Sequence, residues 1–225
     1  MALTPELVAR VHRVVPDSGP RAGTVPLTDA DYDGLVAELL APAHAAGDIW
    51  LFAYGSLIWR PACDVDGQQP AMLRGWHRAF CLRLTRFRGT PECPGLMMAL
   101  DRGGSCRGVV QRLPAAQARE RLGQLLRRET SVKPASNRPR WMTVEVAGRR
   151  RPAIAFSIDR AASNYVGDLS LEETAEILSK AVGHWGAGAE YLLNTVQHLE
   201  SLGIHDRYLW QLQALVAQKI KSATA

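Results

Sequence analysis

The chain has 225 residues, of which 47% are hydrophobic and 22% charged. This size and balance suit one globular domain with a short extension, and they exclude collagen-like, disordered and disulfide-rich miniprotein classes. No apolar run approaches the roughly 18 residues that a membrane span needs, and the first residues lack the charged-then-apolar order of a secretory signal. We therefore expect a cytoplasmic protein with no membrane partner.

The formal net charge is +5, and arginine supplies most of the 27 positive charges. This excess favours anionic ligands, among which nucleic acid and an acidic small molecule are equally compatible with the charge. The cysteines are Cys63, Cys81, Cys93 and Cys106, and no two of them form a C-x-x-C pair. With the histidines scattered as well, we expect reduced thiols and neither a metal nor a cofactor.

The first 47 residues differ from the rest because five prolines interrupt them. One helix is predicted there, from Thr28 to Leu40, with Thr28, Asp29 or Asp31 as its N-terminal cap. We interpret residues 1–47 as an extension that wraps the domain, and residues 48–221 as the domain itself.

From Ile49 the sequence turns to short apolar runs bounded by Gly, Pro or Asp, which predict strands. These runs are IWLFAYG, LRGWHRAFCLRL, PGLMMAL and CRGVVQRL. A short amphipathic helix is predicted from Pro114 to Arg128, followed by a hairpin of Trp141–Val146 and Ala153–Ile158 around GRRRP.

After Tyr165 the periodicity becomes helical, with apolar residues at i, i+3 and i+4. Helices are predicted over Ser170–Val182, Ala189–Ser201 and His205–Lys219, with Ser170 and Asp206 as caps. Strands first and helices later indicate an α+β fold in which a mixed, partly barrel-like sheet is packed by helices.

The strongest local motif is FAYGSLIW, residues 52–59, where an apolar strand runs into Gly55-Ser56. A glycine there lets consecutive backbone N–H groups converge on a carboxylate or phosphate. A plain strand-to-loop turn is the alternative. The motif is neither a P-loop nor a dinucleotide fingerprint, because the further residues that those motifs need are missing.

Glu129 is the second candidate, because it ends the predicted Pro114 helix directly after two core leucines and two arginines. A carboxylate at a helix C-terminus faces the negative end of the helix dipole, so its position calls for a functional explanation. The alternative is a surface ion pair with Arg127 or Arg128. A serine-hydrolase site is disfavoured because no serine lies in a G-x-S-x-G motif.

The chain resembles the ChaC-like glutathione-specific gamma-glutamylcyclotransferases from about Ile49 to Ala217. The blocks that carry the resemblance follow the family's order: WLFAYGSLIWRP, then LRGWHRAFCLRL with Arg88-Gly89-Thr90 and Pro94-Gly95, then Arg128-Glu129, then Asn164-Tyr165-Val166-Gly167, and finally Gly186–Gly203 with Glu190-Tyr191-Leu192. Two positions depart from the pattern. Ala53 stands where the family usually has glycine, and Thr130–Arg140 is longer and more basic than the expected turn.

The resemblance implies a gamma-glutamylcyclotransferase-like fold and an enzyme that cleaves glutathione to 5-oxoproline and cysteinylglycine. It implies that Glu129 is the general acid and base, and that Tyr165 borders the substrate. The loop residues Ala53, Tyr54, Gly55, Ser56, Leu57 and Ile58 would hold the substrate carboxylate. We expect a monomer that binds this small molecule and no nucleic acid.

Two alternatives stay open at this point. A cyclotransferase of the same mechanism could act on other gamma-glutamyl amines or dipeptides. A basic, non-catalytic module could instead use the same loop to bind an acidic ligand or nucleic acid, in which case its binding would be sensitive to salt.

Overall fold

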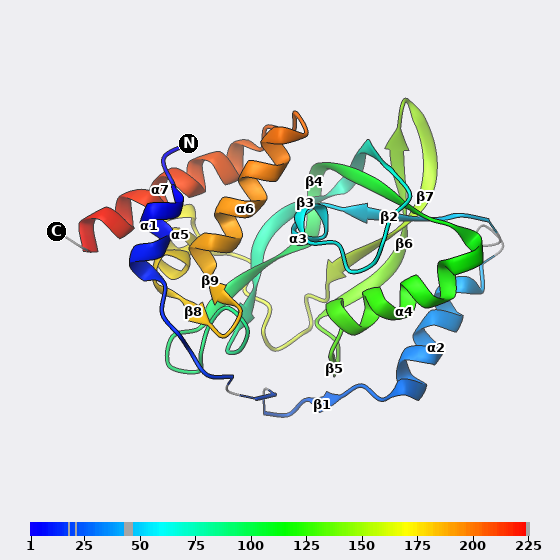
Figure 1. The fold of residues 1–225 in the computed structure, drawn as a ribbon, viewed down its shortest axis with the longest axis horizontal. Coiled ribbons are helices and arrows are strands. Elements are labelled where there is room, and N and C mark those ends of the chain that lie inside the picture. The colour runs from blue at the N-terminus through cyan, green and yellow to red at the C-terminus, as the bar shows by residue number, and fades with distance from the viewer. Residues whose placement is uncertain (18, 21, 43–46, 224–225) are drawn as a thin grey trace. The chain divides into compact units, whose positions relative to one another are not determined.

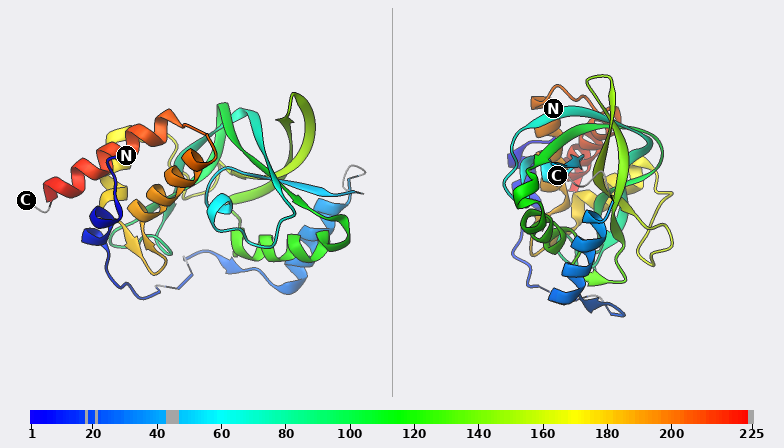
Figure 2. Two further views of the ribbon diagram at one scale, coloured as in Figure 1. Left: turned by 45° about the horizontal axis from the view of Figure 1, so that its top comes forward. Right: turned by 90° about the vertical axis from the view of Figure 1, so that its right-hand side faces the viewer.

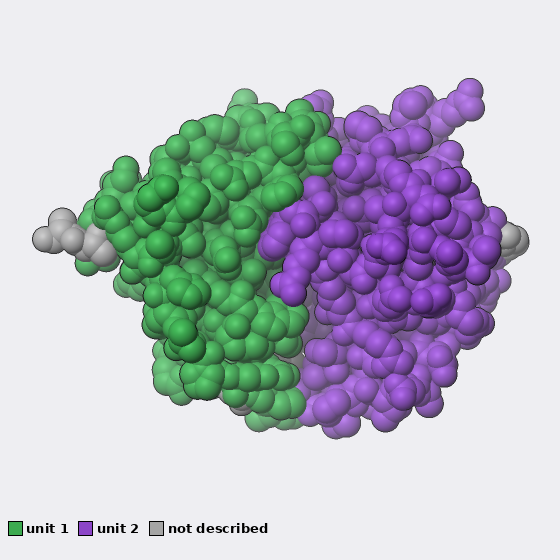
Figure 3. Space-filling view, in the orientation of Figure 1, with its two compact units in different colours: residues 1–23, 79–98, 163–225 green, residues 24–78, 99–162 purple. Residues whose placement is uncertain are grey.

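The structure is a computed structural model that describes residues 1–17, 19–20, 22–42 and 47–223 (Figure 1). The chain divides into two compact units, which Figure 3 distinguishes by colour. Unit 1 comprises residues 1–23, 79–98 and 163–225, and unit 2 comprises residues 24–78 and 99–162. Each unit is therefore assembled from segments that are distant in the sequence. The domain boundary between residues 47 and 48 stays a prediction.

Unit 2 contains most of a closed barrel (Figure 2), in which the strand order is β2-β4-β3-β6-β7. Antiparallel pairing joins β2 to β4, with Ala53 opposite Val109, and a parallel pairing of Leu51 with Ile154 joins β2 to β7. The strands are β2 (Ile49–Ala53), β3 (Gln68–Leu84), β4 (Gly95–Leu113), β6 (Asn137–Val146) and β7 (Arg149–Ile158). The boundary between the units falls within β3 and β4.

The predicted pairing of two strands is confirmed, but GRRRP is not the turn between them: β6 and β7 meet at Ala147-Gly148, and Arg149–Pro152 belong to β7. Ala147 and Gly148 both have positive φ, the backbone form that a tight two-residue hairpin turn requires. Residues 153–158 of β7 are all buried, whereas Arg149, Arg150 and Arg151 are exposed. The three arginines are therefore solvated at the turn end of β7.

Three helices and a small strand pair complete unit 2. α2 (Asp29–Leu40) is capped by Thr28, whose side chain forms a reciprocal capping box with Asp31. α4 (Ala118–Glu129) follows a 3-10 turn and buries Ala118, Leu122, Leu125 and Leu126 on one face. α3 (Ser56–Trp59) is a single turn after β2, and β1 (Val25–Pro26) pairs with β5 (Val132–Lys133).

Unit 1 is mostly helical, and within it α5 and α6 pack on α7 while α1 packs on α6 and α7 (Figure 1). These elements are α1 (Pro5–Val11), α5 (Leu171–Lys180), α6 (Gly188–Ser201) and α7 (Arg207–Ala223), with the short strands β8 (Val182–Gly183) and β9 (Gly186–Ala187). The predicted caps are confirmed, because Ser170 accepts from Glu173 and Asp206 from Leu209. No helix in the described part of the chain is both long and apolar enough to span a membrane.

The predicted α+β class with a barrel-like sheet is confirmed, but further details differ besides the position of the hairpin turn. The runs PGLMMAL and CRGVVQRL belong to one strand, β4, which continues through Gly103 and Gly104 in positive φ. Glycine tolerates that conformation, so the strand bends there instead of ending. α1 was not predicted, because its seven residues are too few for a clear periodic pattern.

Gly108 lies against the end of β2, where a Cβ would collide with the Ala53 carbonyl oxygen and the Phe52 ring. We predict that Gly108→Ala lowers the free energy of unfolding by about 1–3 kcal/mol, because the strand must move to relieve this overlap. Gly123→Ala is the control, since open space surrounds Gly123 on α4 and alanine favours a helix by about 1 kcal/mol. Urea denaturation of both variants measures the difference, and equal effects would contradict this account of Gly108.

Candidate functional site

The loop that follows β2 is held by its own backbone and by a buried arginine. Ala53 and Tyr54 are buried, and the Tyr54 carbonyl accepts from Nε of Arg78 at 2.7 Å. Gly55 precedes the single turn α3, in which the N–H of Ile58 donates to the Gly55 carbonyl at 3.0 Å. Because the first residues of a helix have no intrahelical acceptor, the N–H groups of Ser56 and Leu57 are those that the loop can offer to an anion.

Sequence reasoning missed two buried polar residues that support this loop. Arg78 is 5% exposed, and its guanidinium also donates to the Arg107 carbonyl. Gln111 is 2% exposed, and its Nε2 donates to the Leu57 carbonyl at 3.1 Å. The Oε1 atom of Gln111 is buried and has no partner among the described residues.

Strand alternation carries a signal for Arg78 but not for Gln111, because Val109 and Val110 are both buried and β4 shows no alternation there. Arg78 has the same parity in β3 as the buried Phe80. Ala71 and Leu73 are buried at the opposite parity, and Gly75, with its positive φ, lies between the two registers. A polar residue at an inward position must find a buried partner, and here both partners are carbonyls of the 54–57 loop.

Glu129 is the last residue of α4, and its side chain is only 15% exposed. Oε1 lies 3.4 Å from Nε of Arg128, whereas Arg127 pairs with Asp29 at 2.7 Å. Burial raises the pKa of the Glu129 carboxyl, and the Arg128 charge offsets only part of that rise. The predicted ion pair with Arg128 therefore exists, but it belongs to a buried carboxylate with a raised pKa.

Arg128 joins Glu129 to the loop. Its Nη1 donates to the Arg60 carbonyl and its Nη2 donates to the Ser56 hydroxyl at 3.4 Å, while Nε faces Glu129. The structure thus brings two of the predicted features together in unit 2, namely the loop at residues 53–58 and the carboxylate at the end of α4.

Tyr165 belongs to unit 1. It forms an isolated bridge with Leu82, and the next residue, Val166, donates to the Cys81 carbonyl at 2.8 Å. The Tyr165 ring covers Gly167, where any Cβ would collide with the phenol oxygen. The tyrosine-glycine segment therefore packs on itself. Tyr165 belongs to unit 1, whereas the 53–58 loop belongs to unit 2.

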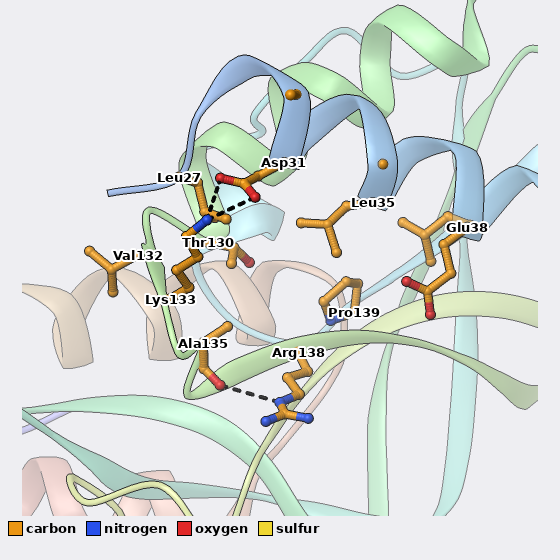
Figure 4. Close-up of a pocket in the computed structure, with 13 residues that line it drawn as sticks. Leu27, Asp31, Leu35, Glu38, Thr130, Val132, Lys133, Ala135, Arg138 and Pro139 are labelled. Carbon is orange, nitrogen blue, oxygen red and sulfur yellow. Dashed lines mark hydrogen bonds and ion pairs between the residues drawn. The ribbon is translucent and has the colours of Figure 1, made fainter. Parts of the chain in front are cut away.

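A pocket of about 550 Å³ lies between α2 and the segment that follows Glu129 (Figure 4). Asp31 and Lys133 pair across it at 2.9 Å, and Nε of Arg138 donates to the Ala135 carbonyl at 3.3 Å. Thr130 contributes to its lining, together with Leu27, Leu35, Leu39, Val132 and Pro139 among others. Sequence reasoning missed this pocket because one of its walls comes from the predicted extension.

The arrangement can bind an anion and transfer a proton. Backbone N–H groups after a buried strand suit a carboxylate, and a buried carboxyl with a raised pKa suits a general base that works near neutral pH. Within the described residues, no three His, Cys, Asp or Glu side chains are grouped as metal ligands.

The chain is similar to known proteins over most of its length. Residues 49–219 match the family described as ChaC-like protein. A glutathione-specific gamma-glutamylcyclotransferase of Escherichia coli is 38% identical over 76% of this chain and 74% of its own. Gamma-glutamylcyclotransferase 2-3 of Arabidopsis thaliana is 30% identical over 73% of this chain and 86% of its own.

Among solved structures, a yeast gamma-glutamyl cyclotransferase specific to glutathione matches with a TM-score of 0.69. The match is 22% identical and covers 76% of this chain and 96% of that one. At this identity the likeness shows a shared fold.

The raised pKa of Glu129 makes a prediction about stability. Between the ordinary pKa of 4.5 and the raised value, the folded state holds a proton that the unfolded state has lost, so the free energy of unfolding falls as pH rises through this window. Glutamine does not titrate. We therefore predict that Glu129→Gln gains stability relative to the wild type at pH 8, and that the gain shrinks as the pH falls toward 4.5.

Glu145→Gln is the control with the opposite sign, because Arg74 holds the pKa of the Glu145 carboxyl below its usual value. That carboxylate contributes stability above its ordinary pKa and loses it as the pH falls. Urea denaturation of both variants at a series of pH values checks the two signs. A pH-independent effect of Glu129→Gln would contradict the raised pKa.

Proposed function

Because the chain belongs to the ChaC-like protein family, we propose that it cleaves glutathione to 5-oxoproline and cysteinylglycine by cyclising the gamma-glutamyl group. The observation that carries this proposal is the buried Glu129 carboxyl, whose pKa is raised and which Arg128 joins to the 53–58 loop. The similarity to a bacterial enzyme named for this reaction supports the choice of substrate.

The reaction needs no nucleophile from the protein. The α-amine of the gamma-glutamyl group attacks the γ-carbonyl of the same molecule, so that a C–N bond closes a five-membered lactam while the amide bond to cysteinylglycine breaks. Holding both groups in one substrate makes the attack intramolecular, and the protein only has to fix their geometry. This agrees with the absence of a serine-hydrolase motif from the sequence.

Glu129 would move the protons. The substrate ammonium must lose a proton before it can attack, and the leaving nitrogen must gain one as the tetrahedral intermediate collapses. Over the whole reaction the attacking nitrogen gives up two protons and the leaving nitrogen takes up two, so one carboxyl group that returns what it accepts is sufficient. Burial strengthens Glu129 as a base, because it disfavours the charged form.

The loop from Ala53 to Ile58 would hold the α-carboxylate of the substrate. The N–H groups of Ser56 and Leu57 suit this role, whereas the N–H of Ile58 already donates to Gly55. Bonds to the Tyr54 and Leu57 carbonyls from Arg78 and Gln111 would keep the loop rigid before substrate binds. We assign Tyr165 to the border of the site, as the resemblance implies.

We further propose that the protein acts in the cytoplasm as a monomer and without a metal or cofactor. None of Cys63, Cys81, Cys93 and Cys106 forms a disulfide, which fits a reducing compartment. Light scattering of the purified protein should then give a mass near the chain mass of 24.7 kDa.

The first test is catalytic. Wild-type protein incubated with reduced glutathione should release equimolar 5-oxoproline and cysteinylglycine, and Glu129→Gln should lower kcat by about 10²–10⁴-fold because only the proton carrier is lost. Glu120→Gln is the matched control, since Glu120 lies exposed on the same helix. Mass spectrometry of both products measures the rates.

Each outcome of this test is informative. Full activity in Glu129→Gln would overturn the assigned role. Wild-type activity on other gamma-glutamyl amines but not on glutathione would change the substrate and keep the mechanism. Inactivity on every gamma-glutamyl compound, together with salt-sensitive nucleic-acid binding, would favour the non-catalytic module.

The second test concerns the loop. Gly55→Val should raise KM for glutathione by about tenfold or more and change kcat less, because a branched side chain at the start of α3 obstructs the approach of a carboxylate to the N–H groups. Steady-state kinetics would be measured on protein whose cooperative unfolding has been verified. An unchanged KM in a folded variant would move the carboxylate site elsewhere.

A further inference from the structure

The predicted extension reaches the residues around Glu129. Two residues before Glu129, Nη2 of Arg127 pairs with Asp29 at 2.7 Å, and the same guanidinium stacks over the Tyr32 ring at 4.4 Å. Asp29 and Tyr32 both lie in the first turns of α2, so this helix contacts the last turn of α4 directly.

The extension also contacts the chain just after Glu129. The Tyr32 hydroxyl donates to the Thr130 carbonyl at 3.0 Å, and the Leu27 N–H donates to the Ser131 carbonyl at 3.2 Å. β1 then pairs with β5, placing Val25 opposite Lys133. Residues 24–40 therefore contact the backbone or side chains of α4 and β5 on both sides of Glu129.

These contacts differ in strength. The Asp29 and Arg127 side chains are 86% and 51% exposed, and such a pair contributes little. Tyr32 is only 7% exposed, and its bond to Thr130 is buried. Burial also raises the pKa of the Tyr32 phenol, which keeps the hydroxyl a donor. The Tyr32 hydroxyl is thus the contact most able to hold the segment beyond Glu129.

Thr130 lines the pocket (Figure 4), is only 5% exposed, and has its backbone held by hydrogen bonds. Its N–H donates to the Leu126 carbonyl at 2.8 Å and ends α4, while its carbonyl accepts from Tyr32. Loss of the Tyr32 bond would therefore loosen the chain directly after Glu129.

We propose that residues 24–40 are a positioning element for Glu129, with Tyr32 as the positioning residue. The element fixes the end of α4, and this orients the carboxylate toward the substrate held by the loop. The inference rests on the proposed role of Glu129 as proton carrier.

A purely stabilising role for α2 is the competing explanation, and the other end of the same helix provides the control. Nε1 of Trp141 donates to the Leu39 carbonyl at 3.0 Å, which anchors the C-terminal end of α2 to β6. Tyr32 and Leu39 are seven positions apart, or about 10 Å along the helix. Tyr32→Phe and Trp141→Phe each remove one side-chain donor to a backbone carbonyl, but only Tyr32 contacts the segment after Glu129.

The kinetic test compares these two variants of the full chain in the glutathione assay. Tyr32→Phe should lower kcat by about tenfold with KM within about twofold of the wild type, because a small misplacement of the base slows the reaction without weakening binding. Trp141→Phe should keep kcat within about twofold at a similar loss of stability. Equal kcat in the two variants would overturn the proposal.

The pH profile of kcat supplies a readout that stability alone would not move. If the end of α4 loosens, water reaches the Glu129 carboxyl and lowers its pKa, so the acid limb of the profile should move to lower pH in Tyr32→Phe. The limb should stay in place in Trp141→Phe. A shift in both variants or in neither would contradict positioning by Tyr32.

Amide hydrogen exchange separates failure of this inference from failure of the proposed function. Residues 127–133 should exchange faster in Tyr32→Phe than in Trp141→Phe, whether or not glutathione is the substrate. If the wild type leaves glutathione unchanged, the proposed function fails, and the exchange comparison still decides whether Tyr32 holds the segment. Equal exchange in the two variants would refute that role.

Discussion

The burial of the Glu129 carboxyl is the constraint on which the site depends. A carboxylate that is removed from water at the negative end of a helix is destabilised in two ways, by desolvation and by the helix dipole. Arg128 is its ion-pair partner, but at 3.4 Å it relieves only part of this cost, so the pKa stays raised. An unfavourable position of this kind is stable only where the surrounding structure holds it, and the raised pKa suits the proton-transfer role that we propose for Glu129.

Arg128 connects the Glu129 carboxyl to the loop after β2, because the guanidinium that faces Glu129 also contacts Ser56 and the Arg60 carbonyl. The loop after β2 is in turn held from the barrel by Arg78 and Gln111. Inward-facing polar side chains of the barrel strands thus end on loop carbonyls, where buried donors find partners. Support from rigid strands suits a loop that must present N–H groups in a fixed direction, as the proposed carboxylate site requires.

One departure from the family pattern, the segment Thr130–Arg140, contacts the predicted extension. The residues after Glu129 form a longer and more basic segment than the resemblance leads one to expect, and the extension covers part of that segment through β1 and α2. Lys133 pairs with Asp31, so part of the added basic charge is balanced within the extension. In the proposal above, the segment after Glu129 and the part of the extension that contacts it together hold the end of α4.

Local patterns determined much of this protein from sequence alone. The capping residues Thr28 and Ser170, the β6–β7 hairpin and the amphipathic face of α4 depend on neighbours a few residues away, so their sequences predict them. The loop at Gly55 and the carboxylate at Glu129 stood out for the same reason, through a turn residue and a misplaced charge. Tertiary structure alone decided which arginine pairs with Glu129, that Arg78 and Gln111 support the loop, and that Tyr32 bonds to Thr130. The contacts of Arg78, Gln111 and Tyr32 join residues tens of positions apart, and only the closed barrel and the docking of α2 on α4 bring them within hydrogen-bonding distance.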